Sequence, residues 1–523
     1  MSTSITAEGQ NKGKFPPQIP YIIGNEGCER FSFYGMRNIL TVFLVSYLLL
    51  HLPESERGAA GKEIFHVFVM GVYFFPLLGG WISDRFLGKY KTILYLSIVY
   101  CLGHLCLAVF EDSRSGFYFG LFLIALGSGG IKPCVSSFVG DQFDQSNKDK
   151  ARVVFDAFYW IINFGSFFAS LFIPLILKNY GPAWAFGIPG VLMAIATFIF
   201  WLGRKDYVNT PATASDPHSF IRVLKTALIS GEGASRPGLT LTYVGVILAV
   251  TALFFWQALG IVAAICLAMV LIMVFGGIGG WMQLDRARGH HPDDAIDGVE
   301  SVLKILIVFG LVTPFWSLFD QKASTWVLQA GAMTFPGWSW FTEPSQMQAL
   351  NPLLVVLLIP FNTMVLYPTL KKFGFNPTAL QRMTFGIVLA GVSWIFVGVY
   401  QLAIDNGREL SILWQIVPYI FLTLGEVFVS ATGLEFAYSQ APQRMKGVIM
   451  SFWSLSVTIG GLWVLLVNNS VKSETATKAI TDISGMSSTA FQMFFFAGFA
   501  FAAAMAFGLY SKRYTLKDHY RSA

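Results

Sequence analysis

Runs of about twenty apolar residues follow one another along almost the whole chain, and they restrict its possible folds more than any other feature. A run of that length crosses the hydrocarbon core of a bilayer as a helix. The runs predict about fourteen membrane-spanning helices, near residues 27–50, 64–86, 91–110, 117–139, 152–178, 183–203, 239–257, 260–283, 302–321, 350–371, 379–401, 412–432, 446–467 and 489–511. Only 13% of the residues are charged, against about 25% in soluble proteins, so a soluble fold would lack polar surface. The sequence predicts an all-α polytopic membrane protein.

The predicted spans fall into groups of six, two and six, separated by polar linkers. The first twenty residues contain no apolar segment of the kind found in a cleaved signal peptide. The predicted parts are a tail (1–20), an N-terminal six-helix bundle (21–203), a linker (204–238), an inserted hairpin (239–283), a linker (284–300), a C-terminal six-helix bundle (301–511) and a tail (512–523).

The basic residues indicate the orientation in the membrane. The formal net charge is +6, and the basic residues stand mostly at the ends of predicted helices. With the N-terminus in the cytoplasm, about 24 Lys and Arg residues fall on that side and about 8 on the other, as the positive-inside rule requires. We therefore expect both termini in the cytoplasm. No nucleic-acid partner is expected, because the sequence has neither zinc-finger spacing nor a basic helix.

The loop after the second span carries a motif of known type. Residues 80–91 read GWISDRFLGKYK, which resembles the Gly-x-x-x-Asp-Arg-x-Gly-Arg-Arg signature of the major facilitator superfamily. A fainter echo, LKKFGFNPTALQRM (370–383), lies at the matching place in the second half, although a glycine-rich turn explains it equally well. Glycines let helix ends approach, and Asp84 can cap a helix or pair with a base. The resemblance implies the two-bundle fold of that superfamily.

Charged residues inside apolar spans are costly and are therefore functional candidates. Glu26, Glu29, Arg30 and Arg37 open the first span, and helical spacing places Glu26, Arg30 and Arg37 on one face. Two carboxylates beside one guanidinium can share a proton, because the second carboxylate lacks a full partner. The alternative for Glu26 and Glu29 is an interfacial ion pair near the membrane surface.

Further charges lie deeper in both halves. Lys132 lies among small residues in the fourth span, Asp320 ends the apolar run PFWSLFD, and Glu426 lies in the run LTLGEVFVS. Basic residues in one bundle and acidic residues in the other favour inter-bundle ion pairs that open and close as gates. The same polarity suits a zwitterionic substrate, such as a peptide with free termini.

Four segments resemble the signatures of the proton-dependent oligopeptide transporter (POT, or PTR2) family. They are GNEGCERFSFYGMR (24–37), GSGGIKPCVSSFVGDQF (127–143), FYWIINFGS (158–166) and GLEFAYSQAP (433–442), and they occur in the family's order. The inserted hairpin is similar to that of bacterial members. The resemblance implies a proton-coupled symporter that imports di- and tripeptides by alternating access, with no cofactor beyond the coupling proton.

The family's residue roles carry over to matching positions. The resemblance implies proton coupling by Glu26, Glu29, Arg30, Asp320, Glu426 and His66. It implies binding of the peptide carboxylate by Arg37 and Lys132, and of the amino end by Asn163, Asn351 and Glu426. It implies side-chain pockets formed by Tyr34, Tyr73, Trp316 and Trp453. The implied gating salt bridges are Arg37–Asp320 and Lys132–Glu426.

Alternatives remain for some of these positions. A lone histidine near a helix start, such as His66, is often an interfacial side chain, although imidazole titrates near neutral pH and can relay protons. Each aromatic residue could serve helix packing instead. Phe33 stands where the family motif has tyrosine, so any hydrogen bond made by that hydroxyl in relatives is absent here.

Other function classes fit the sequence less well. A same-fold symporter of nitrate or another small zwitterion or anion is the nearest alternative, although acidic residues near the implied amino-end site disfavour a simple anion. An enzyme is not expected, because neither a nucleophile elbow nor paired metal-ligand histidines occur, and the doublet His290–His291 lies in a polar linker. Buried charges of both signs fit alternating access better than a channel. The expected location is the bacterial inner membrane, where lipid, protons and small peptides are the partners.

Overall fold

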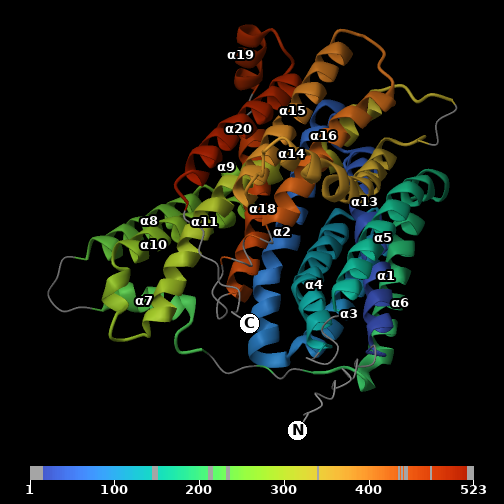
Figure 1. The fold of residues 1–523 in the computed structure, drawn as a ribbon. Helices are drawn as coiled ribbons and strands as arrows, with labels where there is room; N and C mark the ends of the chain where they lie inside the picture. Colours follow the sequence, from blue (N-terminus) through green and yellow to red (C-terminus); the bar gives the residue numbers. More distant parts are fainter. Residues whose placement is uncertain are drawn as a thin grey trace.

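The computed structural model describes residues 16–143, 151–209, 212, 216–230, 236–337, 341–433, 436, 440, 446–470 and 474–514. Long helices dominate these residues and stand side by side as two bundles with a hairpin beside them (Figure 1). Thirteen of the described helical segments are long and apolar enough to cross a membrane. Helix α1 (Ile19–Phe43) is equally long, but its charged residues lower its hydropathy. Counted with α1, these segments confirm the predicted number of spans.

The N-terminal bundle is built on α1 together with five further helices. Helix α2 begins after Pro53 with two glutamates in its first turn, where acidic side chains stabilise the positive end of the helix dipole. Ser113 caps α4 by accepting a hydrogen bond from the amide of Gly116. The five helices are α2 (Glu54–Ile82), α3 (Lys89–Val109), α4 (Arg114–Asp141), α5 (Ala151–Tyr180) and α6 (Pro182–Leu202).

Glycines allow α2 and α4 to pack with their backbones in contact. A Cβ atom added at Gly79 of α2 would overlap the carbonyl oxygen of Gly129 on α4, whereas one added at Gly80 would meet no atom within 4 Å. Close approach of this kind needs residues without side chains. At the far end of this pair, Lys89 Nζ binds Asp141 Oδ2 at 2.6 Å and joins the predicted signature loop to the end of α4.

The C-terminal bundle repeats the six-helix plan. Its helices are α11 (Asp293–Asp320), α13 (Leu350–Phe361), which continues through a π-helical turn into α14 (Tyr367–Lys372), α15 (Ala379–Asp405), α16 (Ile416–Glu426), α18 (Lys446–Ser470) and α20 (Ser488–Ser511). Two short helices that the sequence did not predict follow α11 and α18, namely α12 (Thr325–Gly331) and α19 (Glu474–Ser484). Each bundle has its own apolar core.

The inserted hairpin lies beside the C-terminal bundle, at the left of Figure 1. Its helices α8 (Pro237–Phe254) and α10 (Ile261–Met282) are joined by the single turn α9 (Trp256–Leu259). Asn469 of α18 donates a hydrogen bond to the carbonyl of Leu259 at 3.0 Å, which fixes the tip of the hairpin to the bundle.

The linker predicted at 204–238 contains a ten-residue helix, α7 (Phe220–Ile229). The Gln283 amide holds α7 to the hairpin, because its nitrogen donates to the carbonyls of Ala227 and Leu228 and its oxygen accepts from the amide of Gly238. His291 lies beside the same helix, with Nε2 at 2.9 Å from Thr226 Oγ1 and Nδ1 at 2.9 Å from Nδ1 of His218. The hairpin and its linkers therefore form a connected unit.

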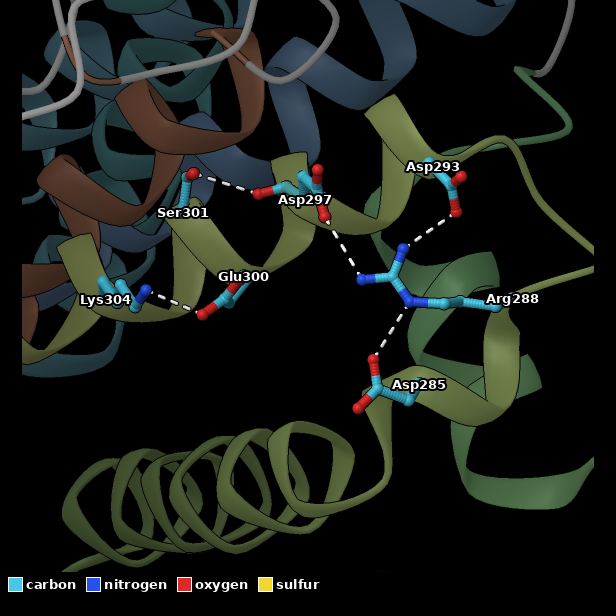
Figure 2. A network of polar contacts seen from close by, with 7 residues as sticks. All are labelled: Asp285, Arg288, Asp293, Asp297, Glu300, Ser301 and Lys304. Atoms are coloured by element: carbon cyan, nitrogen blue, oxygen red, sulfur yellow. Dashed lines mark hydrogen bonds and ion pairs between the residues drawn. The ribbon is translucent and has the colours of Figure 1, made fainter.

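In the linker predicted at 284–300, one arginine, Arg288, pairs with three aspartates, as Figure 2 shows. Arg288 donates to Asp285 at 3.0 Å, to Asp293 at 2.8 Å and to Asp297 at 3.5 Å. Hydrogen bonds to Asp285 and Asp293 raise the pKa of the Arg288 guanidinium. The residues after Pro292 in the predicted linker 284–300 already belong to α11, so this cluster connects the hairpin to the first turns of that helix.

Candidate functional site

The first charged cluster lies inside the N-terminal bundle on α1. Arg30 Nε contacts Glu26 Oε1 at 2.7 Å and Glu29 Oε2 at 2.8 Å. Glu26 is 2% exposed and Glu29 is fully buried, so both carboxylates are enclosed by protein. Glu26 Oε2 and Glu29 Oε1 are buried without a protein hydrogen-bond partner. Because an unpartnered buried carboxylate oxygen is costly, these atoms are suited to receive a proton.

A second ion pair joins the two bundles. Arg37 Nη2 on α1 contacts Asp320 Oδ1 at the end of α11 at 2.7 Å, and both side chains are almost completely buried. The guanidinium also lies over the ring of Phe65, with 5.3 Å from Cζ to the ring centroid. The structure therefore places Arg37 and Asp320 in contact, as the resemblance implied.

Further hydrogen bonds cross the interface close to this pair. Thr41 Oγ1 donates to the carbonyl of Ala323 at 2.7 Å, and Gln348 Nε2 donates to the carbonyl of Asn38 at 2.9 Å. These residues lie toward the end of α1, just after α11 and just before α13. The two bundles are therefore held together in the half of the molecule where α1 ends and α13 begins.

His66 lies at the same interface. Its ring is fully buried inside the protein. Nε2 lies 3.0 Å from Ser324 Oγ on the opposite bundle, whereas Nδ1 has no protein partner. The cations Arg37 and Lys62 act electrostatically on the ring. Its position at a bundle contact is clear, and its role as a relay stays a prediction.

Lys132 faces aromatic rings and not an acid. Its Nζ lies 3.9 Å from the ring centroid of Phe33 and 4.7 Å from that of Tyr73, in cation–π geometry. Among the ion pairs of the described residues, none joins Lys132 to Glu426 in this conformation. Phe33 thus contributes its ring face here, a contact that needs no hydroxyl.

Glu426 has different neighbours. Asn351 Nδ2 donates to Glu426 Oε2 at 2.6 Å and to Thr423 Oγ1 at 3.1 Å, while Asn351 Oδ1 accepts from Lys322 Nζ at 3.0 Å. The sequence reasoning predicted Asn351 and Glu426 but missed Lys322 and Thr423. Lys322 follows Asp320 by two residues, so the rule that marks intramembrane charges as candidates would have found it.

The remaining predicted residues surround this region. Tyr34 lies within electrostatic range of Glu426, as does Tyr159 one helical turn before Asn163. Asn163 Nδ2 donates to the carbonyl of Tyr159 at 3.0 Å and contacts neither Asn351 nor Glu426 through a described hydrogen bond.

Two tryptophans pack together on the C-terminal side. The rings of Trp316 and Trp453 meet edge to face at 5.8 Å, and each is 7% exposed. Both belong to the apolar core of the C-terminal bundle, so packing is part of their role. The fourth family-like segment, 433–442, falls largely outside the described residues.

Comparison with known proteins identifies the family. The family model described as PTR2, POT family, matches residues 90–483. Peptide transporter 3 of Caenorhabditis elegans is 31% identical over 84% of this chain and 57% of its own length. Human solute carrier family 15 member 2 is 33% identical over 75% of this chain and 50% of its own length. The chain therefore spans about half the length of the curated relatives it matches.

Two crystal structures match almost throughout. The POT family transporter PepTSo is 64% identical, with a TM-score of 0.94 over 97% of this chain and 100% of that one. An autoinhibited POT family peptide transporter is 62% identical, with a TM-score of 0.94 over 97% of this chain and 99% of that one. These matches confirm the predicted fold and exclude the enzyme class, and the chain belongs to the POT family of transporters.

Proposed function

We propose that this chain is a proton-coupled symporter that imports di- and tripeptides. The observation that carries the proposal is the Arg37–Asp320 ion pair, buried at the interface of two bundles that each hold further buried charges. Acids and bases facing each other at the interface between the bundles suit a ligand that is itself zwitterionic. The names of the relatives, which are peptide transporters, support the same substrate class.

In this proposal the coupling proton binds to the carboxylates of Glu26, Glu29 and Asp320. Glu26 and Glu29 share one guanidinium, so a proton on either leaves the other as the single negative partner of Arg30. Protonation of Asp320 would release Arg37 and weaken the contact between the bundles. Peptide and proton together then shift the population from one access state to the other, because each binds the two states with different affinity.

Orientation follows from the positive-inside rule. With both termini in the cytoplasm of a bacterial cell, the half in which α1 ends and α13 begins faces outward. The contacts around Arg37 then hold the two bundles together on the outer side.

The test is uptake of labelled dialanine into liposomes that contain the purified protein. An inward proton gradient should drive accumulation that unlabelled tripeptide and a protonophore abolish. Glu26→Gln and Glu29→Gln should lose accumulation but keep exchange of dialanine across the membrane, because binding and the conformational change remain. Glu54→Gln, at the exposed start of α2, is the matched control and should behave as wild type.

Two results would overturn the proposal. Accumulation by the Gln variants under the gradient would remove the coupling role of these glutamates. Absence of dialanine uptake by folded wild-type protein would favour nitrate or another small zwitterion as the substrate.

A further inference from the structure

Lys322 is connected to Glu426 by two hydrogen bonds through the side chain of Asn351. Its ammonium donates to Asn351 Oδ1 at 3.0 Å, and the amide nitrogen of Asn351 donates to Glu426 Oε2 at 2.6 Å. An amide held in this way has its oxygen toward the cation and its nitrogen toward the anion. Lys322 is 5% exposed, and its ammonium also lies over the Phe319 ring. The arrangement is a buried cation and a buried anion bridged by one side-chain amide.

Lys322 is also the main positive charge acting on Glu426. Among the charged groups near that carboxylate, Lys322 has the largest electrostatic effect, followed by Asp320 and Arg37. Lys132 is occupied elsewhere, over the rings of Phe33 and Tyr73. A carboxylate buried between helices needs such a counter-charge, and in this conformation Lys322 supplies it.

We propose that Lys322 is the resident counter-cation of the Asn351–Glu426 site, and that the ammonium group of the substrate takes its place. This inference rests on the proposed function and on the binding of the peptide amino end at Asn351 and Glu426, which the family resemblance implies. The Lys322 ammonium and a substrate ammonium are the same chemical group and need the same acceptors, so they compete for the Asn351 oxygen and for the field of Glu426.

A displaced Lys322 has an acceptor close by. Asp320 Oδ1 binds Arg37, but Asp320 Oδ2 is buried without a hydrogen-bond partner. Asp320 lies two residues before Lys322 and is among the charges that act on it. Transfer of Lys322 toward Asp320 brings a second cation to the carboxylate that Arg37 holds. Substrate binding at one site thereby weakens the inter-bundle ion pair.

The experiment compares two ligands that differ only in the ammonium group. The probes are dialanine and N-propanoyl-alanine, in which a hydrogen replaces the ammonium, and their Kd values are measured by calorimetry on the purified protein at one slightly alkaline pH. In Lys322→Met the ratio of the Kd of N-propanoyl-alanine to that of dialanine should rise about tenfold over wild type, the effect of one competing charge-assisted hydrogen bond. Lys322→Gln, which keeps a donor for Asn351 but not the charge, should rise in the same direction.

The matched control is Lys304→Met, which removes one positive charge from the middle of α11, the helix that precedes Lys322. Lys304 Nζ pairs with Glu300 Oε1 at 2.7 Å, and these two side chains are 35% and 34% exposed. Figure 2 draws this pair, and the ratio should stay at the wild-type value in Lys304→Met. An unchanged or lower ratio in folded Lys322→Met and Lys322→Gln would overturn the proposal, because Lys322 would then only position Asn351. If wild-type protein bound neither probe, the proposed function itself would fail.

Discussion

Breaking the Arg37–Asp320 pair one residue at a time tests whether it acts as a buried ion pair. The two side chains are 6% and 3% exposed, and the atoms Nη2 and Oδ1 are 2.7 Å apart. Unit charges about 4 Å apart attract by about 4 kcal/mol at an effective dielectric constant of about 20. Loss of one partner from a buried pair costs about 3–5 kcal/mol, because the other charge stays buried and unpaired. We expect Asp320→Met and Arg37→Met each to lower the free energy of unfolding by that amount.

The double variant gives the decisive comparison. Replacing both charges with apolar side chains removes the desolvation cost together with the attraction, so it should fall within about 1 kcal/mol of wild type. Unfolding of the four proteins in detergent, followed by tryptophan fluorescence, completes the double-mutant cycle. A double variant as unstable as the sum of the single variants would refute the reasoning. It would show that the two residues act independently.

Two further predictions concern packing and pH. Gly79→Ala should lower the free energy of unfolding by about 1–3 kcal/mol, because its methyl group would overlap the backbone of α4. Gly80→Ala should have little effect, because no atom lies within 4 Å of its Cβ position. Thermal unfolding of both variants checks this prediction. Burial and then the charge of His218 lower the pKa of His291. The unfolded linker therefore binds a proton at His291 more tightly than the folded linker does, so the packing of α7 against His291 should weaken as the pH falls below about 6.5. Hydrogen exchange of the α7 amides at about pH 8 and about pH 5, expressed as protection relative to the intrinsic exchange rate at each pH, measures this effect. Protection that is the same at both pH values, or a His291→Gln variant with the wild-type pH response, would contradict it.

The sequence was most informative about features that depend on short segments. Each span was found from its own twenty residues, because the cost of placing a polar residue in lipid is local and additive along the helix. The short helices α7, α12 and α19 were missed for the complementary reason. Their stability comes from neighbours such as Gln283, which caps α7 from 55 residues away, and a hydropathy pattern has no access to those contacts.

The charged residues show the same division. The cost of a buried charge identified Glu26, Glu29, Arg30, Arg37, Lys132, Asp320 and Glu426 as candidates before any fold was known. Which of them pair depends on distances between the bundles, and two expectations differed in outcome. Arg37 contacts Asp320, whereas Lys132 lies over two aromatic rings, and Lys322 is bridged to Glu426 by the Asn351 amide.

The sequence by itself determined the membrane solvent, the number and order of spans, and the set of buried ionisable residues. Those properties are fixed by the free energy of transferring each segment from water to lipid, which depends on composition alone. Only the tertiary structure decided the partner of each charge and the half of the molecule in which the bundles are held together. A salt bridge or hydrogen bond forms within about 3 Å, and separations of that size between residues hundreds of positions apart are set by how the helices pack.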